Sequence, residues 1–245
     1  MAEPPTLRNR LAALTQARVL LGRAGQGMPT RALLEFQLDH ARARDAVHAV
    51  FDIAGFGDAI GRPVVAVRSR AADRSEYLRR PDLGRLLHAE DESRLRATGD
   101  NLAIIVADGL SATAVRAHAA ALVTAIVARL PDWRIAPVVL ATQARVALGD
   151  AIGNALGVDM SVMLIGERPG LSAPDSLGAY LTWKPRPGRR DSERNCVSNI
   201  RPPHGLGYEV AADTIVRLIN AARHARLTGV ALKHDPISLL PPQTP

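Results

Sequence analysis

The chain has 245 residues, a formal net charge of +7 and 47% hydrophobic residues, a balance ordinary for one large or two small soluble globular domains. Its single cysteine, Cys196, excludes an intrachain disulfide framework and a cysteine-based zinc site, and it fits a reducing cytoplasm. No stretch approaches the roughly 18 apolar residues of a membrane-spanning helix, and residues 1–5 lack the charged-then-apolar layout of a secretory signal.

Mainly helical patterns fill residues 1–98. Apolar residues at helical spacing predict helices over 7–21 and 28–48. A short strand is expected at 63–67, and Pro81 favours the first turn of a helix that we expect to run to about residue 98. The apolar stripe of the second helix consists of Leu33, Leu34, Leu38, Ala41 and Ala46.

Residues 99–234 alternate between short apolar runs and longer helical patterns. This alternation predicts an α/β domain with a Rossmann-like, mostly parallel sheet and helices on both faces, preceded by the mainly helical region. The Pro-rich residues 235–245 are expected to form a flexible tail. The expected strands are 103–106, 135–140, 160–165 and 177–183, and the expected helices are 111–130, 146–156 and 208–227.

The basic excess comes almost entirely from arginine, because lysine occurs only at positions 184 and 233. An excess of this kind is compatible with nucleic acid, an acidic partner surface or a phosphorylated ligand, and equally with an arginine-for-lysine bias spread over the surface. Aromatic residues are only 3%, which disfavours binding by base stacking. The tight clusters are Arg79-Arg80 and the group Arg186, Arg189 and Arg190.

The loop Gly166-Glu167-Arg168-Pro169-Gly170-Leu171 directly follows the strand expected at 160–165. Ligands of open α/β sheets bind just beyond the carboxyl ends of the strands, so this loop lies at the expected ligand edge. Pro169 stiffens the turn but has no N–H to offer a phosphate. Glu167 is the side chain that the loop presents. Arg168 beside it favours its ionised form, which suits hydrogen-bond acceptance better than proton shuttling, and a structural ion pair remains the alternative.

Three other features of the sequence are candidates for a site. Asp108-Gly109-Leu110-Ser111 lies between a strand and a helix start, where phosphates often dock, but it matches neither the dinucleotide fingerprint nor the P-loop, and simple capping by Ser111 is the alternative. The seven histidines show no metal-ligand spacing, so no metal site is expected, and no Asp-x-His-x-x-Gly motif occurs. Cys196 has only arginines near it in the sequence, so a buried inert thiol is the default interpretation.

Several of these patterns occur together in one family. In chain order they are Gly22-Arg23-Ala24-Gly25, Phe36 with Asp39-His40-Ala41-Arg42, Tyr77-Leu78-Arg79-Arg80-Pro81-Asp82-Leu83-Gly84-Arg85, Asp108-Gly109-Leu110-Ser111, Arg145-Val146, the loop 166–171, Ser176-Leu177 and Cys196-Val197-Ser198-Asn199-Ile200. In this order, over roughly residues 18–230, the chain resembles the small (light) subunit of ethanolamine ammonia-lyase.

The resemblance implies a subunit of an enzyme that uses adenosylcobalamin to convert ethanolamine into acetaldehyde and ammonia by a radical rearrangement. It implies a barrel-shaped large subunit that holds the substrate and the catalytic residues, in a hetero-oligomer of six copies of each chain. The small subunit covers the cofactor at the interface, and the family's corrinoid-contacting positions fall on Val146, Glu167 and Cys196. It implies no catalytic residue in this chain. The family binds the cofactor with its own base still on cobalt, in agreement with the missing Asp-x-His-x-x-Gly.

The sequence also indicates where the protein acts and offers an alternative function. Some relatives carry a long N-terminal extension linked to microcompartment packaging, whereas here the helical pattern begins almost at once. The cytoplasm is therefore expected, and packaging is less favoured. The alternative is a stand-alone Rossmann-like module that binds a nucleotide or nucleic acid through its basic surface. The resemblance favours neither nucleic acid nor a membrane as a partner.

Overall fold

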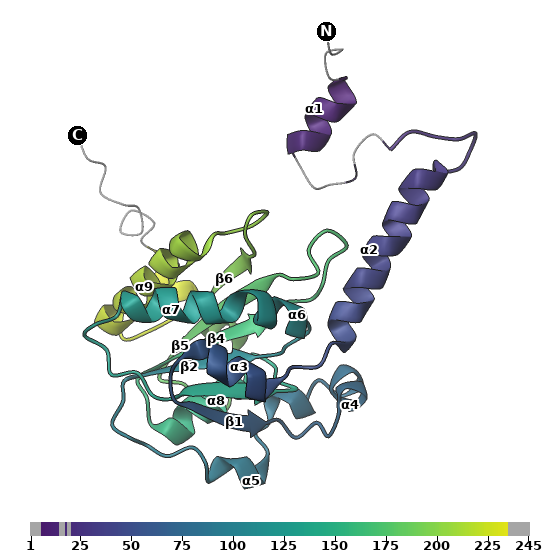
Figure 1. Cartoon of the computed structure of the whole chain (residues 1–245). Coiled ribbons are helices and arrows are strands. Elements are labelled where there is room, and N and C mark those ends of the chain that lie inside the picture. The colour runs from purple at the N-terminus through teal and green to yellow at the C-terminus, as the bar shows by residue number, and fades with distance from the viewer. Residues whose placement is uncertain (1–5, 15–17, 19–20, 235–245) are drawn as a thin grey trace, which may run out of the picture.

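The computed structural model describes residues 6–14, 18 and 21–234, and within them a six-stranded sheet is covered by helices on both faces (Figure 1). The strands are β1 (Val64–Arg68), β2 (Leu102–Ala107), β3 (Val138–Thr142), β4 (Met160–Gly166), β5 (Leu177–Trp183) and β6 (Asn195–Ile200). The α-helices are α1 (Leu7–Leu14), α2 (Thr30–His48), α3 (Ile53–Ile60), α4 (Arg74–Arg79), α5 (Ala89–Glu92), α6 (Ala112–Ala114), α7 (Ala120–Ala128), α8 (Leu148–Leu156) and α9 (Tyr208–Ala225). Shorter turns are η1 (Leu83–Arg85), η2 (Val115–Ala119, π-helical), η3 (Asp191–Glu193) and η4 (Val230–His234).

The sheet combines a parallel and an antiparallel part. Its strand order is β1-β3-β2-β4-β5-β6. The first four strands in this order are parallel, whereas β5 runs antiparallel to β4 and β6 antiparallel to β5. The predicted α/β fold with a mostly parallel sheet is confirmed, and the complete sheet is mixed. Every residue of β2 and β4 is buried, as expected for parallel strands covered on both faces.

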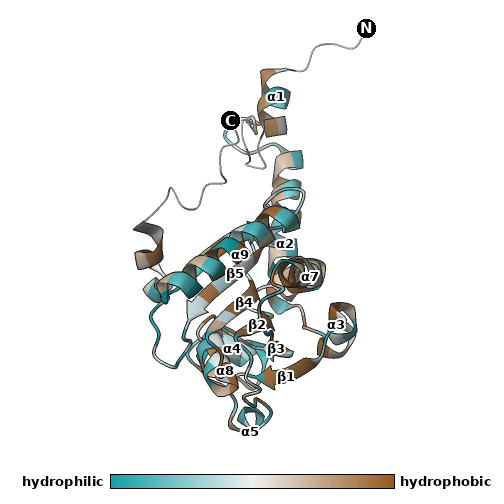
Figure 2. Ribbon diagram, turned by 90° about the vertical axis from the view of Figure 1, so that its left-hand side faces the viewer, coloured by the Kyte–Doolittle hydropathy of each residue, from teal (hydrophilic) through white to brown (hydrophobic). Residues whose placement is uncertain are grey.

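Two hydrophobic cores lie on opposite faces of the sheet. The larger packs α3, α7 and α9 against one face, and the smaller packs α8 against the other. Figure 2 shows α3 and α7 on one side of the strands and α8 on the other. On its face, α8 lies over β2 and β4. Within the described residues, no helix combines the length and apolar character needed to cross a bilayer.

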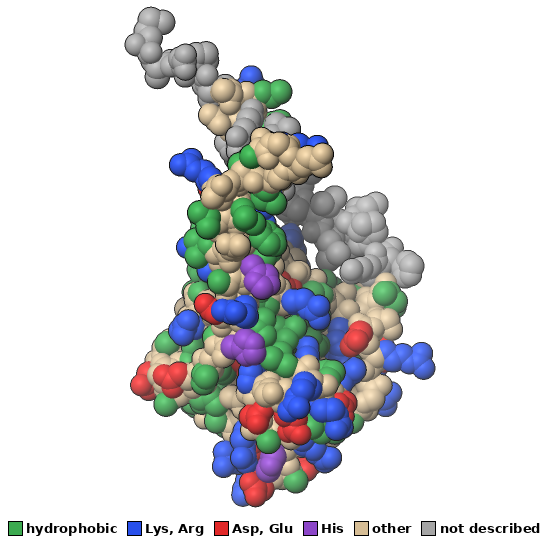
Figure 3. Space-filling view, turned by 90° about the vertical axis from the view of Figure 1, so that its right-hand side faces the viewer, with side chains coloured by type: hydrophobic (Ala, Val, Ile, Leu, Met, Phe, Trp, Pro, Cys, Tyr) green, Lys and Arg blue, Asp and Glu red, His purple; other side chains and the backbone are tan. Residues whose placement is uncertain are grey.

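The helix expected over 28–48 is confirmed as α2, but most of its apolar stripe does not reach a core. The helix projects from the body (Figure 1), and Figure 3 shows apolar side chains along it. Leu34 and Leu38 are exposed, and Ala46, near the end that joins the body, is buried. Helical periodicity therefore indicated the element correctly without indicating what covers it.

The long helix expected from Pro81 to residue 98 is wrong. That segment contains only the short η1 and α5. Between them the chain runs alongside the end of β1, where the N–H of His88 donates to the carbonyl of Arg68 at 3.0 Å. The buried carboxylate of Asp91 then accepts the backbone N–H and the guanidinium of Arg68. These tertiary hydrogen bonds override the local helical preference.

The remaining elements differ in extent from the predictions made from sequence, or were not predicted. α1 ends at Leu14, short of the predicted residue 21, and residues 15–17 and 19–20 lie outside the described residues. β6, which carries Cys196, was not predicted, because its Asn and Ser residues resemble a loop. The tail predicted at 235–245 also lies outside the described residues, and the division into regions 1–98 and 99–234 stays a prediction.

Candidate ligand-binding site

Two adjoining cavities lie where the carboxyl ends of β3 and β4 meet the open face of β5 and β6. One has a volume of about 620 Å³ and the other about 440 Å³, and both are lined by Arg145, Val146 and Tyr180. The first reaches Cys196, and the second reaches Glu167. The three residues expected to contact a corrinoid, although distant in sequence, are thus brought together around one hollowed surface.

The open face exists because the helix that covers this side of the sheet stops short of the last strands. α8 packs over β2 and β4, whereas α9 packs on β5 and β6 from the opposite side. On the uncovered side, Cys196 and Ser198 of β6 are exposed, while Val197 between them is buried in the larger core. Strand alternation therefore aims both polar side chains at the cavities.

Glu167 is fixed by three donors. Its Oε1 accepts the hydroxyl of Ser198 at 2.5 Å, and its Oε2 accepts the hydroxyl of Ser176 at 2.5 Å and the backbone N–H of Asn199 at 3.3 Å. An ionised carboxylate accepts about four hydrogen bonds, so capacity for one more donor remains, on Oε1. Arg168 is exposed and forms no ion pair with Glu167 among the described residues, so the structural ion pair considered from sequence is not found.

Gly178 leaves the space that the Glu167 carboxylate occupies. A Cβ atom at position 178 would lie 2.8 Å from Glu167 Oε1 and 3.2 Å from the carboxyl carbon. Since three donors hold this carboxylate, it cannot move aside without losing hydrogen bonds.

Replacing Gly178 by alanine is therefore expected to destabilise the chain by about 1–3 kcal/mol, the usual cost of overpacking. Urea unfolding would measure it. Gly170→Ala is the matched control, since its nearest neighbour would be 3.7 Å away. In a Glu167→Ala background the cost of Gly178→Ala should shrink, because the colliding group is gone. A Gly178→Ala chain as stable as the parent would contradict the assigned contact.

Tyr180 and Cys196 form a cross-strand pair between β5 and β6, and both line the larger cavity. Burial raises the pKa of the Tyr180 phenol well above its ordinary value, and the neighbouring Cys196 adds to the shift. The phenol is therefore neutral at physiological pH. Cys196 is exposed, so the expectation of a buried inert thiol is wrong, because β6 presents this side chain on the uncovered face.

The polar side chains of the Asp108-Gly109-Leu110-Ser111 turn form hydrogen bonds within the chain. The Ser111 hydroxyl accepts the N–H of Ala114 at 3.1 Å, which confirms the capping interpretation. The buried Asp108 carboxylate accepts the N–H groups of Gln143 and Ala144, and so holds the loop that follows β3. Burial raises the pKa of Asp108, while these N–H groups and Arg74 oppose the shift. This turn positions the neighbouring loop of the site.

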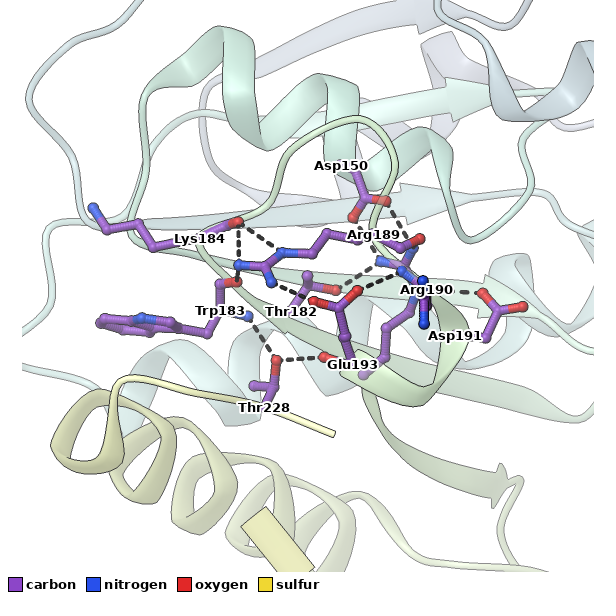
Figure 4. Close-up of polar contacts among 10 residues, drawn as sticks. Asp150, Thr182, Trp183, Lys184, Arg189, Arg190, Asp191, Glu193 and Thr228 are labelled. Atoms are coloured by element: carbon purple, nitrogen blue, oxygen red, sulfur yellow. Dashed lines mark hydrogen bonds and ion pairs between the residues drawn. The ribbon is translucent and has the colours of Figure 1, made fainter. Parts of the chain in front are cut away.

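Hydrogen bonds and ion pairs made by its arginine side chains hold the connection between β5 and β6 in place (Figure 4). Arg189 donates to the carbonyls of Trp183 and Lys184 and pairs with Glu193 at 2.5 Å. Arg194 forms a bidentate ion pair with Asp150 of α8, at 2.6 and 2.7 Å, and donates to Thr182. Arg189, a member of the cluster Arg186, Arg189 and Arg190, is therefore occupied by structural contacts.

Sequence reasoning named Val146, Glu167 and Cys196 but missed Tyr180, Ser198 and the role of Arg145 in joining the two cavities. Arg145 stood next to Val146 in a recognised motif, so it could have been considered. Ser198 also stood in a recognised motif, beside Cys196, whereas Tyr180 stood in none. The place of both residues in the site depends on the pairing of β5 with the unpredicted β6.

The fold and this surface define an α/β protein with a candidate ligand surface that extends from the carboxyl edge of the sheet onto uncovered antiparallel strands. The family model for the ethanolamine ammonia-lyase light chain (EutC) matches residues 6–233. The chain belongs to the ethanolamine ammonia-lyase light chain family, and the resemblance inferred from the ordered motifs is confirmed.

Curated relatives agree over most of the chain. A protein of Bradyrhizobium diazoefficiens named ethanolamine ammonia-lyase small subunit is 58% identical, covering 94% of this chain and 91% of the relative. Relatives of the same name from Rhodopseudomonas palustris and Azotobacter vinelandii are 56% and 51% identical, each covering 92% of this chain and 89% and 87% of their own length respectively.

Proposed function

We propose that this chain is the non-catalytic small subunit of an adenosylcobalamin-dependent ethanolamine ammonia-lyase, and that it supplies one wall of the cofactor site against a catalytic large subunit. The enzyme converts ethanolamine into acetaldehyde and ammonia by a radical mechanism, in a cytoplasmic hetero-oligomer of six copies of each chain. Family membership supports the identity of the enzyme, and the arrangement around Glu167 supports a cofactor-binding role for this chain.

The fixed Glu167 carboxylate is the observation that carries the proposal. The rim of a corrinoid bears amide side chains with N–H donors, and Oε1 of Glu167 has capacity for one such donor. Val146 offers apolar contact in both cavities, and Cys196 is small enough to allow close approach of a bulky ligand. These residues fit a corrinoid rim by the chemistry of their side chains.

The same side chains are poorly suited to proton transfer. Three donors already occupy the carboxylate of Glu167, and the pKa of Tyr180 is raised away from neutral pH. When bound, the cofactor supplies the cobalt–carbon bond whose homolysis begins the radical chemistry, and protein groups bind, orient and shield it. We therefore assign binding and positioning to this chain, and no catalytic residue.

The uncovered face of β5 and β6 favours the proposal that another polypeptide supplies the second wall of the cofactor site. The cavities lie on an open face of β5 and β6, with Cys196 and Ser198 exposed on it. A cofactor of corrinoid size on this face would keep much of its surface outside the chain. A large subunit seated over the same face would enclose the cofactor and exclude water from it.

Reconstitution tests the proposal. The chain alone is expected to show no turnover of ethanolamine with adenosylcobalamin, and turnover is expected once the large subunit is added. Acetaldehyde formation, followed by a coupled reduction, is the measurement, with the large subunit alone as the control. Turnover by this chain alone, or an equal rate from the large subunit alone, would overturn the proposed division of roles.

A further inference from the structure

Arg145 lines both cavities and has a buried guanidinium nitrogen without a hydrogen-bond partner among the described residues. It follows β3 at the carboxyl edge of the sheet and lines both cavities. Its Nε is buried without a hydrogen-bond partner, and its side chain forms no ion pair within the described part of the chain. The half-buried Arg74 and the buried Arg194, by contrast, are each paired with an aspartate.

The side chain is held in place by packing rather than by a partner charge. Its guanidinium carbon lies 4.5 Å from the centre of the Tyr77 ring. Tyr77 is fully buried, and its hydroxyl donates to the carbonyl of Ala144 at 2.9 Å. Gly84 makes the close packing possible, because a Cβ there would lie 2.8 Å from the Tyr77 ring and 3.0 Å from Arg145 Cγ. The guanidinium is thus preorganised by a stacked aromatic ring.

The charges around the cavities leave a positive excess. Of the carboxylates that line them, Asp82 is paired with Arg80 at 2.7 Å, Asp191 lies 3.5 Å from Arg194, and Glu167 is held by its three donors. The lining arginines that pair with no carboxylate among the described residues are Arg85, Arg145 and Arg168. Arg85 and Arg168 are exposed to solvent, so Arg145 is the cation that gains most from an anion in the site.

We propose that Arg145 binds the phosphodiester of the cofactor's nucleotide tail. This inference rests on the proposed function, because base-on adenosylcobalamin carries one such group. A planar guanidinium can donate two parallel N–H bonds to a phosphate, and such pairs are strong and directional. In this arrangement the carboxylate of Glu167 accepts hydrogen bonds from amide groups of the corrinoid rim. The guanidinium of Arg145 binds the anionic nucleotide tail.

The test compares two corrinoids on the complex of the full chain with its large subunit. Adenosylcobalamin carries the phosphodiester, and adenosylcobinamide lacks the nucleotide tail. Arg145→Met, which keeps apolar contact with Tyr77, is expected to raise the dissociation constant of adenosylcobalamin by roughly tenfold to a hundredfold and to leave that of adenosylcobinamide unchanged. Absorbance titration of the corrinoid measures both. An equal loss for both corrinoids, or no loss for either, would overturn the assignment.

Two further measurements separate binding from packing. Rising salt should weaken adenosylcobalamin binding to the unmodified complex more than adenosylcobinamide binding, and Arg145→Lys, which keeps the charge, should recover part of the lost affinity. Arg217→Met, on α9 at the opposite face, is the matched control and should change neither constant. If Glu167→Ala weakens adenosylcobalamin binding while Arg145→Met does not, this inference fails alone. If the unmodified complex binds neither corrinoid, the proposed function fails with it.

Discussion

Replacing Asp150 by asparagine is expected to lower the free energy of unfolding by about 3–5 kcal/mol, because it removes the only buried carboxylate that pairs with the buried guanidinium of Arg194 among the described residues and leaves the exposed Asp191, 3.5 Å away, as the remaining counter-charge. The side chains of Asp150 and Arg194 are each only 2% exposed and are joined by two hydrogen bonds, at 2.6 and 2.7 Å. Thr182 supplies a neutral acceptor for Arg194 but no charge. Denaturant unfolding at neutral pH, compared with the parent chain, is the measurement.

Two controls test whether burial is the cause. Asp82→Asn removes a carboxylate of an exposed pair with Arg80 and should change stability little, since solvent screens that pair. The double replacement Asp150→Leu with Arg194→Met should recover most of the loss, because it removes both buried charges together. A chain in which Asp150→Asn costs no more than Asp82→Asn would contradict the expectation.

The pair also bears on the site. Arg194 directly precedes β6, and Asp150 belongs to α8, so the ion pair ties the strand that carries Cys196 to the helix on the same face of the sheet. Both Arg194 and Cys196 line the larger cavity. The position of this wall therefore depends on a buried ion pair whose arginine itself borders the cavity.

Replacing Glu167 by alanine is expected to raise the dissociation constant of adenosylcobalamin in the complex with the large subunit by roughly tenfold or more. A hydrogen bond to a charged acceptor contributes about 1.5–3 kcal/mol, and Glu167 is oriented in advance by Ser176 and Ser198. Absorbance titration of the corrinoid on the reconstituted complex measures the constant.

Glu92→Ala is the matched control for Glu167, because Glu92 is an exposed glutamate on α5 outside the lining of both cavities. Thermal melting of each variant shows whether a change in affinity reflects a change in fold. Glu167→Gln preserves the size of the side chain and should also weaken binding, because its amide nitrogen cannot accept a hydrogen bond. An unchanged constant for both Glu167 variants would remove this residue from the site.

Most elements of the α/β region could be predicted because they are local. The apolar runs at β2, β4 and β5, and the helical periodicity of α8 and α9, are properties of neighbouring residues, and the structure has these elements where they were expected. The incorrect and missing predictions share one physical cause, which is contact between segments distant in sequence. The segment after Pro81 follows β1 because Asp91 binds Arg68, and β6 exists because it pairs with β5.

By itself, the sequence determined the family and the ends of strands at which a ligand surface should lie, because ordered motifs and strand-to-turn boundaries are written in consecutive residues. Only the tertiary structure decided that Glu167 is held by Ser176 and Ser198 rather than by Arg168, and that the buried Nε of Arg145 has no hydrogen-bond partner among the described residues. Such contacts depend on strand register and on which face α8 leaves open. Both arise when distant segments pack together, so no local pattern of residues encodes them.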